Sequence, residues 1–141
     1  MAPDLRGYNL SDKPLGISAY RGDVLVNDVV GLIDSAKREN AVIVGHDWGG
    51  AVAWSVAMSN PARVDRLVVL NCGHPSAMAK RIRGDLRQTA RSWYIFAFQL
   101  PWLPELFARA SGFRLLVRAL RGSSRPGTFT DDCIAEYRKA W

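Results

Sequence analysis

The chain has 141 residues, of which 48% are hydrophobic and 23% are charged, and its formal net charge is +6. These values are typical of one globular domain in solution. Because no apolar run approaches the roughly 18 residues of a membrane span and the N-terminus shows no signal peptide, we expect a cytoplasmic protein without a membrane partner. Cys72 and Cys133 match neither a metal spacing nor a disulfide framework, so we expect buried, reduced thiols.

The charge is unevenly distributed along the chain. Residues 1–75 carry 7 Lys/Arg and 8 Asp/Glu, whereas residues 76–141 carry 12 and 5. Such asymmetry can indicate nucleic-acid binding. Here, however, Arg114, Arg118 and Arg121 recur at helical spacing among apolar residues, which is typical of a solvated helix face. We therefore expect no nucleic-acid partner and interpret the change near residue 75 as a change of module.

The first elements follow from turn formers and hydrophobic spacing. Residues 4–20 are dense in turn formers and predict an irregular loop. Residues 22–37 predict a helix, because their apolar residues recur at helical spacing: Leu25, Val29, Leu32 and Ile33. Residues 41–44 form a continuous apolar, β-branched run, as expected of a strand covered on both faces.

The six residues after that run, Gly45-His46-Asp47-Trp48-Gly49-Gly50, predict a sharp turn with a carboxylate at its apex. This spacing is that of a nucleophile elbow, in which flanking glycines permit a strained turn between a strand and a helix. A carboxylate nucleophile suits displacement at saturated carbon, which leaves an ester that water then cleaves. Epoxides and alkyl halides are the substrates this chemistry favours. The alternative is that Asp47 only caps the following helix, expected over residues 48–60.

A second strand is predicted over residues 64–70, which contain the apolar run Leu67-Val68-Val69-Leu70. Strand, helix and strand within about thirty residues form a βαβ unit, so we expect a parallel sheet with a right-handed crossover. A sheet of two or three strands has bare edges and little surface to bury these runs. The sequence therefore resembles the middle of a larger fold.

After Pro75 the pattern predicts helices and no strand. We expect helices over residues 76–91, 93–99, 103–120 and 131–141, with Thr130 as the N-cap of the last one. The only linker-like stretch is Ser123-Ser124-Arg125-Pro126-Gly127.

Three segments resemble the α/β-hydrolase family of epoxide hydrolases and haloalkane dehalogenases, the branch with an aspartate nucleophile. They are Ala-Pro-Asp-Leu-Arg-Gly-Tyr-Asn-Leu-Ser-Asp-Lys-Pro from Ala2 to Pro14, the glycine-flanked run around Asp47, and Arg66-Leu67-Val68-Val69-Leu70-Asn71 with His74-Pro75. The resemblance implies an α/β fold. Residues 1–75 would form a partial α/β-hydrolase core with the nucleophile elbow, and residues 76–141 would form part of a helical cap domain.

The resemblance also implies roles for two further residues. Ser92-Trp93-Tyr94-Ile95-Phe96-Ala97-Phe98-Gln99 resembles the epoxide hydrolase cap, where a tyrosine four residues before Phe-Gln faces the nucleophile, so Tyr94 would protonate the departing alkoxide. Packing among its aromatic neighbours is the alternative. Trp48, next after the nucleophile, would supply a backbone N–H to the oxyanion and line the substrate pocket. No cofactor and no metal are implied.

Several family features are missing from the sequence. The His-Gly-x-Pro segment that completes the oxyanion hole is absent, and so are the later acid, histidine and second cap tyrosine; neither His46 nor His74 matches that histidine. Asn9 stands where glycine is usual, a mild change because Asn tolerates positive φ. We therefore expect an internal fragment of a longer protein.

The sequence thus predicts an epoxide hydrolase-type enzyme that opens a small-molecule epoxide to a vicinal diol through an ester of Asp47. The fragment itself is expected to be unable to turn over. The alternatives are a haloalkane dehalogenase, which shares the nucleophile, and a non-catalytic truncated remnant. The oligomeric state is not predicted.

Overall fold

The computed structural model describes residues 1–84, 97, 100 and 102–141, and the chain divides into two compact units, Met1–Asp85 and Leu86–Trp141. The helix expected over residues 93–99, with Tyr94, lies almost wholly outside the described residues. The helix that follows Pro75 is α3 (Pro75–Gly84), which belongs to the first unit. The assignment of residues 76–141 to a cap domain stays a prediction.

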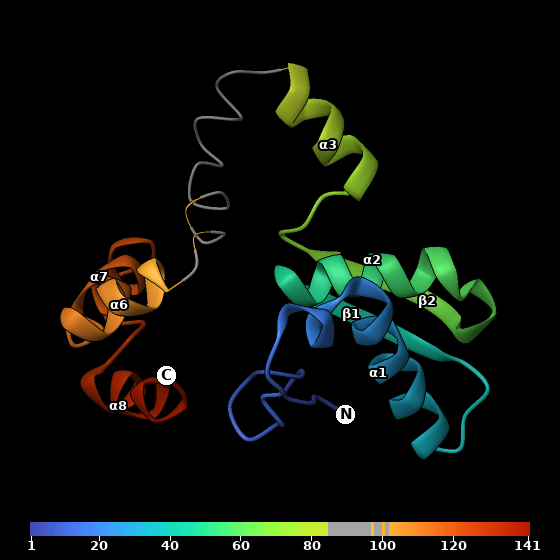
Figure 1. The fold of residues 1–141 in the computed structure, drawn as a ribbon, viewed down its shortest axis with the longest axis horizontal. Coiled ribbons are helices and arrows are strands. Elements are labelled where there is room, and N and C mark those ends of the chain that lie inside the picture. Colours follow the sequence, from blue (N-terminus) through green and yellow to red (C-terminus); the bar gives the residue numbers. More distant parts are fainter. Residues whose placement is uncertain (85–96, 98–99, 101) are drawn as a thin grey trace. The chain divides into compact units, whose positions relative to one another are not determined.

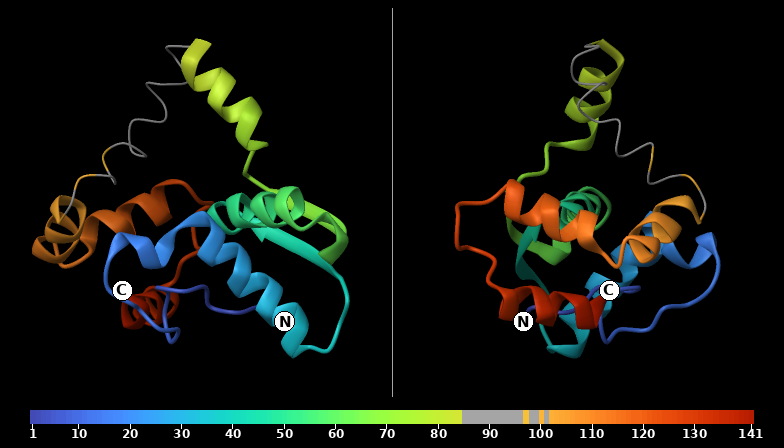
Figure 2. Two further views of the ribbon diagram at one scale, coloured as in Figure 1. Left: turned by 45° about the vertical axis from the view of Figure 1, so that its right-hand side comes forward. Right: turned by 90° about the vertical axis from the view of Figure 1, so that its left-hand side faces the viewer.

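The first unit contains the expected strand–helix–strand arrangement. Strands β1 (Ala41–His46) and β2 (Val64–Leu70) pair in parallel, with Val44 beside Val68. Helix α2 (Trp48–Ser59) and the short turn η2 (Pro61–Arg63) connect them, and α2 runs alongside both strands (Figures 1 and 2). The βαβ prediction is confirmed, and β1 extends two residues beyond the apolar run that predicted it.

Helix α1 (Gly22–Ser35) packs against α2 and supplies half of the small core of this unit. The buried apolar side chains come from both helices: Val26, Ile33, Ala53 and Val56. The preceding segment, expected to be irregular throughout, contains a short 3₁₀ helix, η1 (Ile17–Tyr20). The apolar spacing therefore predicted this helix, and Ile33, one of the residues in that pattern, is buried.

Only one face of the strand pair is covered in the part of the chain that the structure describes. The residues that alternate away from α2 are exposed, with Val44 at 64% and Leu70 at 51%, and Val42 and Val68 lie on the same face. The expectation that β1 is covered on both faces is wrong for these residues. In a strand, successive side chains point to opposite faces, and α2 covers one face alone.

In the second unit, the single helix expected over residues 103–120 is two helices, α6 (Leu103–Ala110) and α7 (Arg114–Gly122). The break has a local cause. Gly112 adopts φ 56°, its N–H donates to the Arg109 carbonyl, and the Phe113 N–H donates to the Ala108 carbonyl. These two bonds form the Schellman motif that ends helices at a glycine. Apolar spacing continues through the break, which is why periodicity alone missed it.

Helix α8 (Asp131–Ala140) begins where the sequence predicted, because the Thr130 hydroxyl accepts a hydrogen bond from the Cys133 N–H at 3.3 Å. Its buried residue is Ile134, and its aromatic residues contact those of neighbouring segments. The Tyr137 ring lies 5.9 Å from Phe129, and Trp141 lies 5.5 Å from Phe113, measured between ring centroids. These contacts join α8 to the preceding loop at Phe129 and to Phe113, the N-cap residue of α7.

The structure tests the expected burial of the two cysteines and the expected absence of a membrane-spanning helix. Both cysteines are free thiols, but Cys72 is half-buried and Cys133 is exposed, so the expectation that both are buried is wrong. Cys133 lies in the first turn of α8, on a side that no neighbouring element covers. Among the described helices, none has the length and hydropathy needed to cross a bilayer.

Candidate active site

Asp47 lies at the turn between β1 and α2 in a backbone conformation that is rare for a non-glycine residue. Its φ is 51° and its ψ is −119°. Such a conformation costs about 1–3 kcal/mol and persists only where the surrounding structure imposes it. The turn is tied to the neighbouring strand, because the Asp47 N–H donates to the Leu70 carbonyl at 3.1 Å. The strain falls on the residue that the sequence predicted as nucleophile.

The Asp47 side chain does not act as a helix cap. Asp47 occupies the N-cap position of α2, yet its carboxylate accepts no hydrogen bond from the first turn. Within the described residues it also forms no ion pair, and the residue is exposed. A capping aspartate is favoured because it satisfies a helix N–H. The geometry thus leaves the carboxylate open to a substrate.

Two glycines allow α2 to approach the sheet closely enough to form this turn. A Cβ at Gly45 would lie 2.5 Å from the Gly49 carbonyl oxygen, and one at Gly50 would lie 2.7 Å from the Cys72 Cβ. Gly49, the second flanking glycine of the elbow pattern, would meet nothing within 4 Å. Glycine is required at positions 45 and 50 by close packing, whereas the positive φ is at Asp47 itself.

The end of β2 lies beside the end of β1. Asn71 has φ 54°, and its side-chain Nδ2 lies 3.2 Å from the Nε2 of His46. Ligands of open parallel sheets bind beyond the carboxyl ends of the strands, which is where Asp47, His46 and Asn71 meet. The sequence pattern predicted no role for Asn71. The signal available was an Asn directly after a strand, since Asn tolerates positive φ.

Trp54 fixes the segment that follows β2. Its indole N–H donates to the Cys72 carbonyl at 3.4 Å, and its ring meets that of His74 edge-on with centroids 4.8 Å apart. The Nδ1 of His74 accepts a hydrogen bond from the Ser76 N–H at the start of α3. His74 is therefore engaged in local structure. Neither His74 nor His46 hydrogen-bonds to the Asp47 carboxylate in the described residues.

Trp48 is the first residue of α2, and its side chain is 59% exposed. A helix leaves its first N–H groups without intrahelical acceptors, so this N–H points out of the helix end beside Asp47. The position fits an oxyanion donor. Tyr94 lies outside the described residues. No group of His, Cys, Asp and Glu suited to a metal ion occurs in the described part of the chain.

A groove of about 630 Å³ runs along the free edge of β1 but does not include Asp47. All six residues of β1 line it, together with residues of α1, α2 and the N-terminal segment such as Leu5, Val29 and Val52. Its lining includes Gly45, His46 and Gly49, so the groove reaches the carboxyl end of β1 beside the exposed Asp47. The described part of the chain therefore places the candidate nucleophile at an open surface.

Residues 1–138 match the family described as the alpha/beta hydrolase fold, and the chain belongs to this family. It is 44% identical, over its whole length, to the AB hydrolase superfamily protein YfhM of Bacillus subtilis (strain 168). It is 36% identical, over 98% of its length, to epoxide hydrolase 1 of Caenorhabditis elegans. It covers 49% and 35% of those two proteins.

Among solved structures, a point mutant of an epoxide hydrolase from Bacillus megaterium, in complex with its product, a naphthyloxy-propane-1,2-diol, superposes with a TM-score of 0.84 at 35% identity. The match covers 97% of this chain and 48% of that protein. The chain thus spans about half the length of this protein and half or less of the curated relatives it matches. The α/β-hydrolase fold, as two parallel strands with flanking helices, and the expected relationship to epoxide hydrolases are both confirmed.

Proposed function

We propose that the whole protein is an epoxide hydrolase that forms an ester between Asp47 and its substrate. The observation that carries this proposal is the conformation of Asp47. Its backbone is held at φ 51°, and its exposed carboxylate does not cap helix α2. The relatives support the substrate class, since several are epoxide hydrolases and one was solved with a vicinal diol as its product.

In the first step, a carboxylate oxygen of Asp47 attacks one epoxide carbon, forming a C–O bond while a ring C–O bond breaks. Tyr94 donates its phenolic proton to the alkoxide that leaves, giving a hydroxyalkyl ester. The role of Tyr94 rests on the sequence resemblance alone. The epoxide itself supplies the leaving group, so no cofactor takes part.

In the second step, water attacks the carbonyl carbon of the ester. The Trp48 N–H donates to the oxyanion that forms, and cleavage of the ester releases the diol and regenerates the carboxylate. The proton that this hydrolysis releases returns the Tyr94 phenolate to the phenol. This water needs a general base, and neither His46 nor His74 hydrogen-bonds to the Asp47 carboxylate within the described residues. We propose that the 141-residue chain stops at the ester and does not turn over.

The proposal extends to the domain organisation of the chain and to the compartment in which the whole protein acts. Residues 1–75 form part of the hydrolase core, and residues 76–141 form part of a helical cap domain. The whole protein acts in the cytoplasm on a small-molecule epoxide and has no nucleic-acid partner. The support is the family membership together with the composition.

The test is alkylation of the 141-residue chain by phenyl glycidyl ether, an aryl epoxide, followed by intact mass and peptide mapping. We expect one equivalent of adduct, on the peptide that contains Asp47. Asp47→Asn removes it, whereas Asp65→Asn, which alters an exposed carboxylate of β2, leaves it unchanged. Tyr94→Phe slows adduct formation about 100-fold, at the low end of general acid catalysis.

Three results would contradict this function. An adduct that persists in Asp47→Asn shows that another nucleophile reacts. Release of bromide from 1-bromobutane with no dependence on Tyr94, and no reaction with the epoxide, assigns the nucleophile to a haloalkane dehalogenase instead. No adduct from either reagent, in a chain shown to be folded by circular dichroism, identifies a non-catalytic remnant.

A further inference from the structure

Five arginines gather around two adjoining hollows in the second unit. Arg114, Arg118 and Arg121 lie on α7 at helical spacing, Arg138 lies on α8 and Arg109 ends α6. Arg114 and Arg138 line both hollows, although they come from different helices. The fold thus places two cationic side chains from separate helices in the wall that the two hollows share.

Little negative charge offsets this cluster. Arg121 pairs with Asp131 at 2.5 Å and also donates to the Phe129 carbonyl. In the described part of the chain the other four arginines form no ion pair, and no Asp or Glu lines either hollow. Like charges that are brought together without a counter-charge repel each other. An anion at the shared wall would remove that repulsion.

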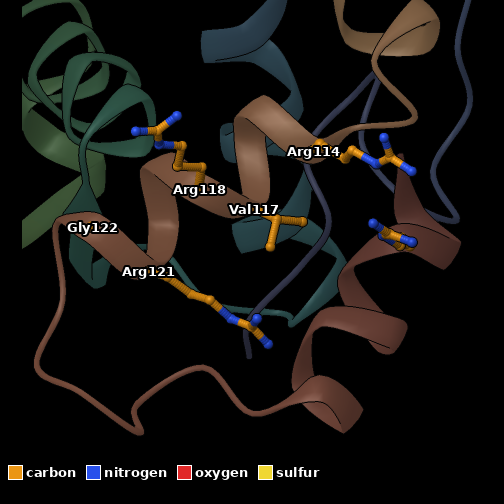
Figure 3. A pocket seen from close by; sticks show the side chains of 6 residues that line it. Arg114, Val117, Arg118, Arg121 and Gly122 are labelled. Carbon is orange, nitrogen blue, oxygen red and sulfur yellow. The ribbon is translucent and has the colours of Figure 1, made fainter.

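Both hollows are open to solvent, and their volumes are comparable to those of small-molecule sites. Their volumes are about 470 and 700 Å³, within the range of about 300–1,000 Å³ that is usual for such sites. Figure 3 shows Arg114 and Arg121 at opposite ends of α7, with Val117 between them and the Arg118 side chain leaving the helix in another direction. Val117 and Leu115 add apolar lining beside the guanidinium groups.

We propose that this cluster binds the phosphate group of a small molecule, held between Arg114 and Arg138. A phosphate monoester carries close to two charges at neutral pH and three acceptor oxygens, so forked guanidinium groups from two helices can share it. A nucleic acid fits less well. Within the residues that the structure describes, no aromatic side chain lines the hollows to stack on a base, and stacking is a main source of single-strand affinity.

The test is a titration of the ¹⁵N-labelled 141-residue chain with phenyl phosphate, and separately with inorganic phosphate, at constant ionic strength set by NaCl. We expect saturable shifts of backbone amides in α7 and α8. The double variant Arg114→Gln/Arg138→Gln weakens phenyl phosphate binding about tenfold or more, as expected for lost charge-assisted hydrogen bonds. Arg114→Lys, which keeps the charge and removes the fork, gives an intermediate loss.

Arg125→Gln is the matched control, because Arg125 belongs to the same unit and lines neither hollow. It should bind phenyl phosphate as the unaltered chain does. Shifts that stay linear with concentration, or equal losses in Arg125→Gln and in the double variant, overturn the proposal, since they indicate a diffuse charge effect. Binding to phosphatidic acid vesicles without binding of phenyl phosphate or inorganic phosphate also overturns it, in favour of a membrane surface. Because Asp47 takes no part here, this result is independent of the epoxide experiment.

Discussion

The guanidinium of Arg6 donates two hydrogen bonds to the carboxylate of Asp28, from Nε to Oδ2 at 2.8 Å and from Nη2 to Oδ1 at 2.6 Å. This forked pair joins the N-terminal loop to the middle of α1, and both side chains are about two-thirds covered. The hydrogen bond from Arg6 lowers the pKa of Asp28 below its ordinary value, against the opposing effect of desolvation.

Replacement of Asp28 by Asn should therefore lower stability in a pH-dependent way. A carboxylate whose pKa is lower in the folded state stabilises the fold above its unfolded pKa of about 3.9, and this stability is lost as the pH falls through the folded value. We expect Asp28→Asn to lower the urea midpoint at pH 7, and the difference from the unaltered chain to shrink in acid. An equal effect from Asp65→Asn would contradict this role, because no ion pair to Asp65 occurs in the described residues.

Gly50→Ala tests the close approach of α2 to the segment after β2. The added Cβ would lie 2.7 Å from the Cys72 Cβ and 3.0 Å from the Val69 Cγ1, and a Cβ held by the backbone cannot rotate away. Overpacking of this kind costs about 1–3 kcal/mol, more than the gain of up to about 1 kcal/mol in helix propensity. Gly31→Ala in α1 meets nothing within 4 Å and should be neutral or stabilising in the same urea titration.

Thr130→Ala tests the cap of α8. Loss of the hydroxyl that accepts from the Cys133 N–H should destabilise the second unit by about 1 kcal/mol. The measurement is thermal unfolding followed by circular dichroism. Thr128→Ala, two residues earlier in the same turn, removes a hydroxyl for which no hydrogen bond is found in the described residues, and should leave the transition in place. A similar loss of thermal stability in both variants would show that the capping hydrogen bond of Thr130 does not stabilise α8.

The uncovered face of the strand pair should make the 141-residue chain bind the dye ANS and self-associate. Val42, Val44, Val68 and Leu70 form an apolar surface on two adjacent strands, and such surfaces associate. The double variant Val44→Thr/Val68→Thr keeps β-branched residues and should reduce dye fluorescence and the mass measured by light scattering. A monomeric chain that binds no dye would show that this face is covered in solution.

Much of the architecture followed from the sequence. The apolar runs at 41–44 and 64–70 predicted the two strands, and the spacing of Val29, Leu32 and Ile33 predicted α1, because these signals lie within a few residues of one another. The division of residues 103–120 into two helices did not follow, although Ser111-Gly112 was a readable stop signal. Apolar periodicity outweighed the glycine in that prediction.

The candidate site, like the fold, was predicted only in part from the sequence. The spacing of Gly45, Asp47 and Gly49 was enough to propose the nucleophile, whereas the steric need for Gly50 and the contact between Asn71 and His46 were not visible in it. Those contacts join residues more than twenty positions apart. No local pattern contains both partners, so only the folded chain brings them together.

The sequence by itself determined which residue is the candidate nucleophile, where the βαβ unit lies and how α8 begins, because each depends on neighbours within one or two turns of chain. Tertiary structure decided the rest. The backbone strain at Asp47 arises where β1, α2 and the end of β2 meet, and the arginine cluster arises where Arg138 of α8 lines the same hollows as the arginines of α7. Both come from long-range packing, in which elements must share space that no single segment defines.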